Sequence, residues 1–156
     1  STTVTGLWHL EGETVTALAD GQEVPDLTVT DGAVTLPTAT GRAQVGLPYT
    51  STLATQRIEA GAGDGTAQGK TKRIARMVIR AIASLGGSFG PDEDHLDLIP
   101  YRRGSDLMDE VPPLLTGDTD QLAFPGGFET DGRIWLVCDQ PLPFTLVALF
   151  PRLESD

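Results

Sequence analysis

Glycine and proline interrupt this chain so often that long regular elements have little room. The 156 residues include 18 glycines and 11 prolines, and these stand between short apolar runs. Such punctuation is typical of many short strands joined by turns. Because aromatic residues make up only 6% of the chain, its core must be built mainly from Val, Leu, Ile and Ala. We therefore predict a mostly β fold, an antiparallel β-sandwich or barrel-like domain with long loops and little helix.

The clearest local signal is an Asp-Gly pair at residues 31–32, between two runs rich in β-branched residues at 27–30 and 33–36. Asp-Gly is a preferred two-residue connection of a β-hairpin. Alternation along each strand then predicts which side chains share a face. The apolar pairs are Leu27 with Val29 and Val34 with Leu36, and Thr28, Thr30 and Thr35 take the other side.

Other short apolar runs between turn residues predict the rest of the sheet structure. The expected strands are 14–19, 27–36, 73–83, 121–124, 133–138 and 144–150, with a further short candidate at 42–47. We expect one β-rich domain over residues 1–156, forming part of a longer protein. Residues 61–69, GAGDGTAQG, predict a mobile loop exposed at the surface.

Residues 72–85, KRIARMVIRAIASL, fit either of two structures. As a helix, the segment has an apolar stripe with its arginines opposite, and periodicity alone favours this interpretation. As a strand, one face would carry Ala75, Met77, Ile79, Ala81 and Ala83, and the other Ile74, Arg76, Val78, Arg80 and Ile82.

The net charge of −11 argues against sequence-independent binding to nucleic acid, which needs a basic surface. The charge is also segregated along the chain. Five of the eleven basic residues are Lys70, Lys72, Arg73, Arg76 and Arg80. The acidic stretch that follows contains Asp92, Glu93, Asp94, Asp97, Asp106, Asp109 and Glu110. These two runs either pair within one subunit or pair between subunits, where they would set specificity and register.

No motif for catalysis or ligation emerges from the sequence. Gly69-Lys70-Thr71 lacks the upstream glycine of a phosphate-binding loop, because Asp64 stands in its place. His9 and His95 have no zinc-type spacing, and the acidic residues at 92–97 do not follow the calcium-binding loop pattern. Cys138 lies within an apolar run and is expected to be a small buried hydrophobe. We therefore expect no enzymatic activity, no catalytic, cofactor-binding or metal site, and no cofactor.

The opening segment GLWHLEGETVTALADG at 6–21 resembles a segment that recurs in large virion proteins of tailed bacteriophages. The resemblance continues through VGLPY at 45–49, KRI at 72–74 and LTG at 115–117, and ends with DQPLPFTLVAL at 139–149. The related proteins are stabilisation, tail-tube or tail-nozzle (tail tubular B-like) proteins, in which such a segment lies toward the C-terminus.

This resemblance implies a non-enzymatic structural component of a phage tail or tail nozzle that mediates subunit packing. It also favours a strand over a helix at 72–85. Implied partners are further copies of the chain, as a homo-oligomer, and neighbouring tail proteins, without sequence-specific nucleic acid binding or membrane insertion. The implied location is the virion tail, after synthesis in the host cytoplasm. The subunit interface would use the charged residues Lys72, Arg73, Arg76, Arg80, Asp92, Asp94 and Asp97.

An alternative function uses the opening segment as a binding surface. There Leu7, Trp8 and Leu10 form an apolar cluster on a short strand, with His9 and Glu11 on the opposite face. Trp8 would contact a sugar ring while His9 and Glu11 form hydrogen bonds to it. The chain would then be a carbohydrate-binding module that contacts a host surface glycan.

Overall fold

The computed structural model describes residues 1–59, 65–66, 68–108 and 110–155. Strands account for 46% of the described residues, and they form several antiparallel sheets. The helix in the described residues is a single 3-10 turn, η1 (Trp8–Leu10). The prediction of a mostly β, sandwich-like fold with little helix is confirmed. Most of the predicted loop at 61–69 lies outside the described residues.

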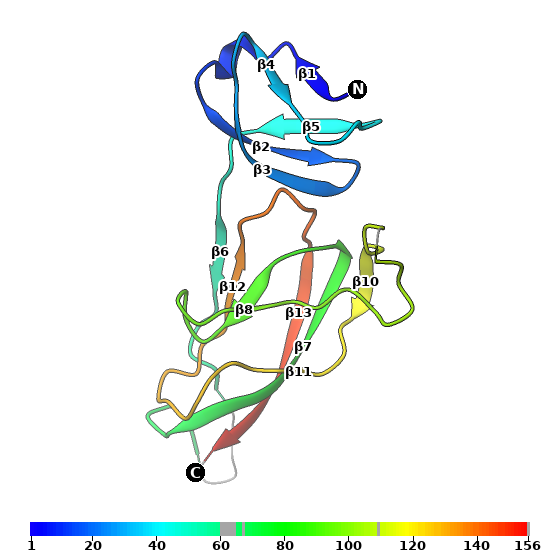
Figure 1. The fold of residues 1–156 in the computed structure, drawn as a ribbon. Helices are drawn as coiled ribbons and strands as arrows, with labels where there is room; N and C mark the ends of the chain where they lie inside the picture. Colours follow the sequence, from blue (N-terminus) through cyan, green and yellow to red (C-terminus); the bar gives the residue numbers. More distant parts are fainter. Residues whose placement is uncertain (60–64, 67, 109, 156) are drawn as a thin grey trace. The chain divides into compact units, whose positions relative to one another are not determined.

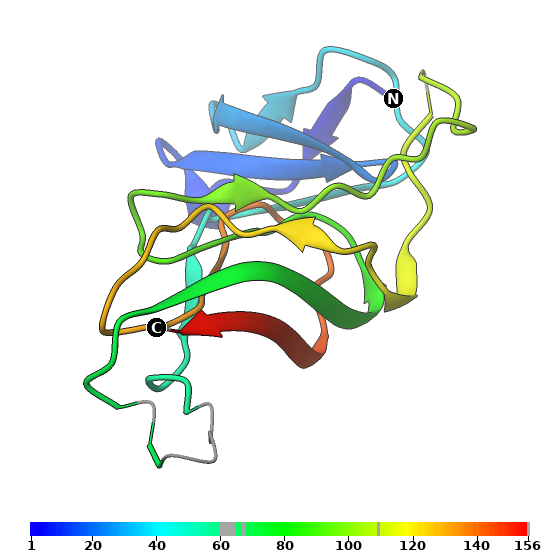
Figure 2. The same ribbon diagram turned by 90° about the horizontal axis from the view of Figure 1, so that it is seen from below.

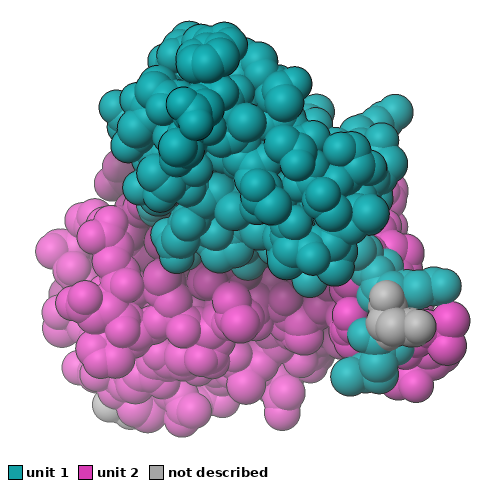
Figure 3. Space-filling view, turned by 45° about the horizontal axis from the view of Figure 1, so that its top comes forward, with its two compact units in different colours: residues 1–50, 108–111, 139–142 teal, residues 51–107, 112–138, 143–156 magenta. Residues whose placement is uncertain are grey.

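The chain forms two compact units, coloured separately in Figure 3. Unit 1 comprises residues 1–50, 108–111 and 139–142, and unit 2 comprises 51–107, 112–138 and 143–156. Each unit has its own buried apolar clusters. The expectation of one domain over residues 1–156 remains a prediction.

Unit 1 contains two small antiparallel sheets (Figure 1). In one, β1 (Thr3–Thr5) pairs with β4 (Ala33–Thr35). In the other, β2 (Thr14–Ala19) lies between β3 (Gln22–Thr28) and β5 (Ala43–Gly46). The core of unit 1 is aliphatic, as the scarcity of aromatic residues predicts. Its buried members are Leu7, Val15, Ala17, Ala19, Val29, Val34 and Leu36.

The predicted hairpin around the 31–32 turn is only partly correct. Asp31 and Gly32 form the turn with φ of 52° and 64°, and the flanking Thr30 and Ala33 form an isolated bridge. The longer ladders, however, join other partners, because β3 pairs with β2 and β4 pairs with β1. A second Asp-Gly turn, at residues 20–21, closes the β2–β3 ladder. The predicted faces are correct, since the apolar side chains point inward and the threonines outward.

Unit 2 contains two four-stranded antiparallel sheets (Figures 1 and 2). In the first, the long strand β7 (Lys72–Ser84) pairs along one side with β13 (Leu146–Ser155), and along the other with β10 (Leu115–Asp118) and β11 (Leu122–Ala123). The second has the order β6 (Ser51–Ala54), β12 (Trp135–Cys138), β8 (Ser88–Gly90), β9 (Asp97–Leu98). The core contains Ile74, Met77, Ile79, Phe89, Ile99, Leu122, Phe124, Ile134 and Leu136.

Residues 72–84 form a strand, so the helical alternative suggested by periodicity is wrong. From Arg76 to Ile82 the two faces alternate as predicted for a strand, with Met77, Ile79 and Ala81 inside. The phase changes at Ala75, which has no partner in the β13 register although Ile74 and Arg76 both do. This bulge turns Ile74 inward, contrary to the predicted face.

Two edge strands of these sheets contain a proline. Pro25 lies in β3, whose partner among the described residues is β2, and Pro151 lies in β13, whose partner is β7. Proline lacks an N–H and is therefore confined to sheet edges and bulges. The predicted strand at 144–150 is present, and it continues through Pro151 to Ser155.

Candidate functional site

The outer face of the β7–β13 ladder carries a row of arginines, which we call the arginine face. It comprises Arg73, Arg76, Arg80 and Arg152, together with the interspersed Val78, Ile82, Val147 and Phe150 and one acidic residue, Glu154, opposite Arg73. In unit 2, this face combines half-exposed apolar side chains with guanidinium groups. Aromatic residues and arginine are both enriched at protein–protein interfaces.

Arg80 is held by groups of its own chain. Its Nε donates to Asp118 Oδ1 at 2.6 Å and its Nη2 to Asp118 Oδ2 at 2.9 Å. The guanidinium carbon lies 4.9 Å from the centre of the Phe150 ring, within range of a cation–π contact. Because of this ion pair, the pKa of the Asp118 carboxyl is lowered and the pKa of Arg80 is raised. Arg80 therefore pairs with Asp118 of β10. The sequence had suggested the acidic stretch at 92–110 as its partner.

Arg76 and Arg152 lie directly opposite each other on β7 and β13, and both are exposed. Like charges opposite each other across two strands are destabilising. An acidic group on a binding partner would relieve that repulsion. The sequence placed Arg76 at an interface but missed Arg152, because only the strand register brings the two together.

Lys72 and Arg73 contribute less to this surface than the sequence suggested. Lys72 has 1% of its surface exposed, and a Cβ on Gly132 would lie 2.5 Å from Lys72 Cε. Its side chain is buried because it runs beneath the 129–132 segment, so Lys72 presents almost no surface to another subunit. Arg73 is half-buried, and its Nε has no hydrogen-bond partner among the described residues.

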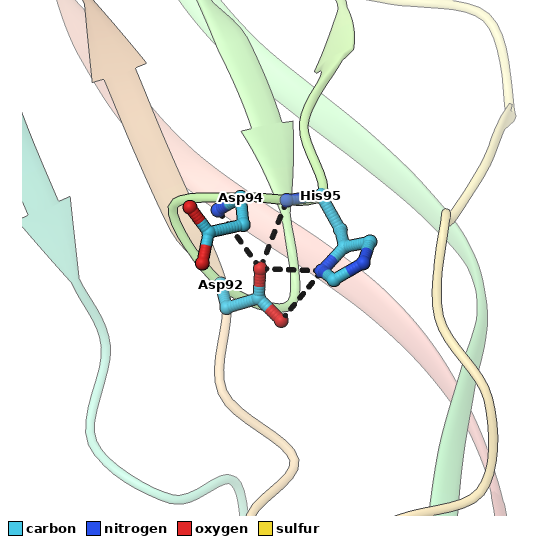
Figure 4. Close-up of polar contacts among 3 residues, drawn as sticks. All are labelled: Asp92, Asp94 and His95. Atoms are coloured by element: carbon cyan, nitrogen blue, oxygen red, sulfur yellow. Dashed lines mark hydrogen bonds and ion pairs between the residues drawn. The ribbon is translucent and has the colours of Figure 1, made fainter.

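The acidic residues at 92–97 form a local structure instead of pairing with β7 (Figure 4). The carboxylate of Asp92 accepts hydrogen bonds from the backbone N–H groups of Asp94 and His95, and it contacts His95 Nδ1 at 2.8 Å. The His95 contact lowers the pKa of Asp92, and Asp92 in turn raises the pKa of His95. Asp94 and Asp97 are exposed to solvent.

The proposed ligand residues Trp8, His9 and Glu11 lie in and beside η1, so the prediction of a short strand there is wrong. The Glu11 carboxylate accepts hydrogen bonds from the backbone N–H groups of Asp31 at 2.9 Å and Gly32 at 2.7 Å. The Trp8 ring lies on Gly32, because a Cβ there would be 2.5 Å from the ring atoms. Glu11 thus holds the turn, whereas Trp8 remains 69% exposed.

A shallow depression of about 460 Å³ also lies in unit 1, lined by Leu18, Asp20, Gly21, Arg42 and Gln44. Its carboxylate is already engaged, since Asp20 accepts hydrogen bonds from the backbone N–H groups of Gly41 and Arg42. These bonds lower the pKa of Asp20. The depression therefore offers a solvent-exposed guanidinium and amide, without an available acid or base.

Two further searches bear on the chemistry of the described residues. Within them, no group of three or more His, Cys, Asp or Glu side chains is placed to hold a metal ion. No helix in this part of the chain is long and apolar enough to cross a membrane.

Comparison with known proteins adds no relative. No protein-family model matches the chain, and no curated protein is significantly similar to it. A functional argument has to start from the structure itself, and it starts here from the arginine face of unit 2.

Proposed function

We propose that this chain is a non-enzymatic packing domain of a tailed-bacteriophage virion, located in the tail or tail nozzle. The observation that carries the proposal is the arginine face. It presents Ile82, Val147 and Phe150, each about half exposed, beside the guanidinium group of Arg80, which Asp118 and Phe150 hold in place. The resemblance to tail proteins in the 6–21 and 139–149 segments supports the assignment to a tail.

A sheet face is well suited to packing because its side chains project from a hydrogen-bonded frame. The Arg80–Asp118 pair and the Phe150 contact already fix part of the face before any partner binds. Less side-chain freedom is lost on association when a surface is ordered beforehand. The arginine face is therefore suited to repeated contact between subunits.

Sedimentation velocity tests the packing role over protein concentrations from about 1 µM to about 1 mM. The unaltered protein is expected to associate, and V147S/F150S should weaken association because it removes apolar surface from the arginine face. The matched control is Leu98→Ser, which removes a 75% exposed apolar side chain from β9. Equal loss of association in both variants would contradict a role for this face.

The reading frames that flank the coding sequence test the virion assignment separately. Portal, capsid or tail genes are expected beside it. A metabolic operon in that position would overturn the assignment.

A second candidate function is recognition of a host glycan, favoured by the exposure of Trp8. The ring is held flat against Gly32 and could stack on a sugar. Glu11 is engaged with the turn, so polar recognition would depend on His9. A glycan array tests this function: a signal that Trp8→Ala abolishes would support it, and the absence of any signal would reject it.

A further inference from the structure

The charge of the protein is divided unequally between its two units. Unit 1 contains nine acidic residues and one basic residue, Arg42, for a formal charge of −8. Unit 2 contains thirteen acidic and ten basic residues, for a formal charge of −3. Both units are net negative, so any electrostatic complementarity between copies has to come from local patches and not from the units as wholes.

The most basic surface described above is the arginine face of unit 2. Its Arg76 and Arg152 lie opposite each other without an intervening acid in the strand register. Beside them lies Phe150, with 46% of its surface exposed. A ligand that matches this face has carboxylates for the arginines and a flat apolar group.

Unit 1 presents such a ligand in a segment that we call the tryptophan corner: Trp8, Glu13 and Asp31. All three residues are exposed. The corner is ordered by backbone hydrogen bonds from Val29 N–H to Glu13 O and from Gly12 N–H to Val29 O. The Glu11 carboxylate holds the 31–32 turn, on which the Trp8 ring lies.

We propose that the tryptophan corner of one copy docks on the arginine face of unit 2 in a second copy. The carboxylates of Glu13 and Asp31 pair with Arg76 and Arg152, and the indole of Trp8 packs against guanidinium and apolar groups. This inference rests on the proposed packing function and names the contact that performs it. Tryptophan and arginine are the residue types that most often dominate binding energy at interfaces.

The two surfaces differ, so the contact is head-to-tail. A pair of copies joined in this way retains one unused face, on the first copy, and one unused corner, on the second. A contact of this kind generates a ring when its rotation closes and a filament when it does not. An assembly that repeats this one contact would fit a ring-shaped or tubular location in a particle.

Two charge variants test the proposal. The face variant is R76E/R152E, and the corner variant is E13Q/D31N, in which asparagine tolerates the positive φ of residue 31. Each variant alone should weaken self-association by about tenfold or more. Mixed in equal amounts, they should form a 1:1 dimer and nothing larger. In that dimer the intact corner of one variant binds the intact face of the other.

The control for the face variant is R42E/R103E, which changes the net charge equally at exposed arginines that do not belong to β7 or β13. The control for the corner variant is E93Q/D94N in the acidic loop, which changes the net charge by the same amount. Circular dichroism establishes that every variant remains folded. Trp8→Ala should also weaken association by about tenfold.

Three results would overturn the inference. The first is association of the face variant as strong as that of the wild type. The second is a loss of association in E93Q/D94N while the corner variant still associates. The third is the absence of a dimer in the mixture. A wild-type protein that stays monomeric at all concentrations would instead contradict the packing function itself.

Discussion

Asp92 and His95 form a carboxylate–imidazole pair whose contribution to stability depends on pH. The pKa of Asp92 is below its ordinary value of 3.8, so its contribution to stability is lost as the pH falls through the lowered pKa. The pKa of His95 is above its ordinary value of 6.5, so its contribution is lost as the pH rises through the raised pKa. The pair therefore holds the 91–95 turn best at mildly acidic pH.

Substituting Asp92 should reset the titration of His95. In Asp92→Asn the imidazolium loses its carboxylate partner, so the pKa of His95 should fall toward 6.5. A pH titration of the His95 imidazole by NMR measures the change, with Glu93→Gln as the control. An unaltered His95 titration in Asp92→Asn would show that the contact does not persist in solution.

Glu11 is expected to matter for stability more than its exposed position suggests. Its carboxylate accepts hydrogen bonds from two backbone N–H groups of the 31–32 turn, whereas no such bond is described for the Glu13 side chain. Glu11→Ala should therefore lower the free energy of unfolding by about 1 kcal/mol. Glu13→Ala should change it by less than about 0.5 kcal/mol. Chemical denaturation compares the two variants, and equal effects would contradict the bracing role of Glu11.

At the scale of elements, threonine hydroxyls complete the ladder around β7. The backbone N–H of Ile79 donates to Thr119 Oγ1, and that of Ala83 donates to Thr116 Oγ1, both at 3.0 Å. Ile79 is 1% exposed, whereas Ala83 is exposed. If the threonine hydroxyl is removed, water can therefore bind the backbone N–H of Ala83 but not that of Ile79.

Replacing these threonines should therefore have unequal effects. Thr119→Val keeps the side-chain shape but leaves the Ile79 N–H unsatisfied, which should cost about 1–3 kcal/mol of unfolding free energy. Thr116→Val should cost less than about 0.5 kcal/mol. Thermal unfolding compares the two, and a similar loss in both would contradict the difference in hydration.

In this chain the sequence predicts local structure better than it predicts which strands pair with each other. Turn chemistry identifies the 31–32 turn, and alternation identifies which side chains of 27–36 face inward. Neither reveals that β3 and β4 pair with different strands, because pairing depends on distant segments. Segment 72–84 is similar: its apolar residues fit a helix until β13 and β10 provide hydrogen-bond partners.

The same limit applies to the candidate surface. Charge segregation along the sequence identified Arg76 and Arg80 as surface residues of interest. It did not identify Asp118 and Phe150 as the groups that hold Arg80, because they come from other strands. It also placed Lys72 on the surface, since nothing in the local sequence predicts that the 129–132 segment covers it.

For the molecule as a whole, the excess of acid controls colloidal behaviour. The formal net charge is −11 at pH 7, and the isoelectric point calculated from the sequence is about 4.4. Repulsion between copies disappears near the isoelectric point, so solubility should be lowest there. Turbidity measured from pH 7 to pH 4 at low salt should rise near pH 4.4. A maximum well above that pH would indicate that a particular interface, and not net charge, controls precipitation.

The prolines of β3 and β13 restrict how copies of this protein can polymerise. A long strand with one neighbour can act as a template on which the backbone of another chain adds, and repeated addition produces fibres. Pro25 and Pro151 each remove an N–H from such a template. Strand addition at these two edges is thereby discouraged, which favours recognition by side chains there. Side-chain contacts can be tuned by single substitutions, so the size of an assembly can change without any change in the sheets.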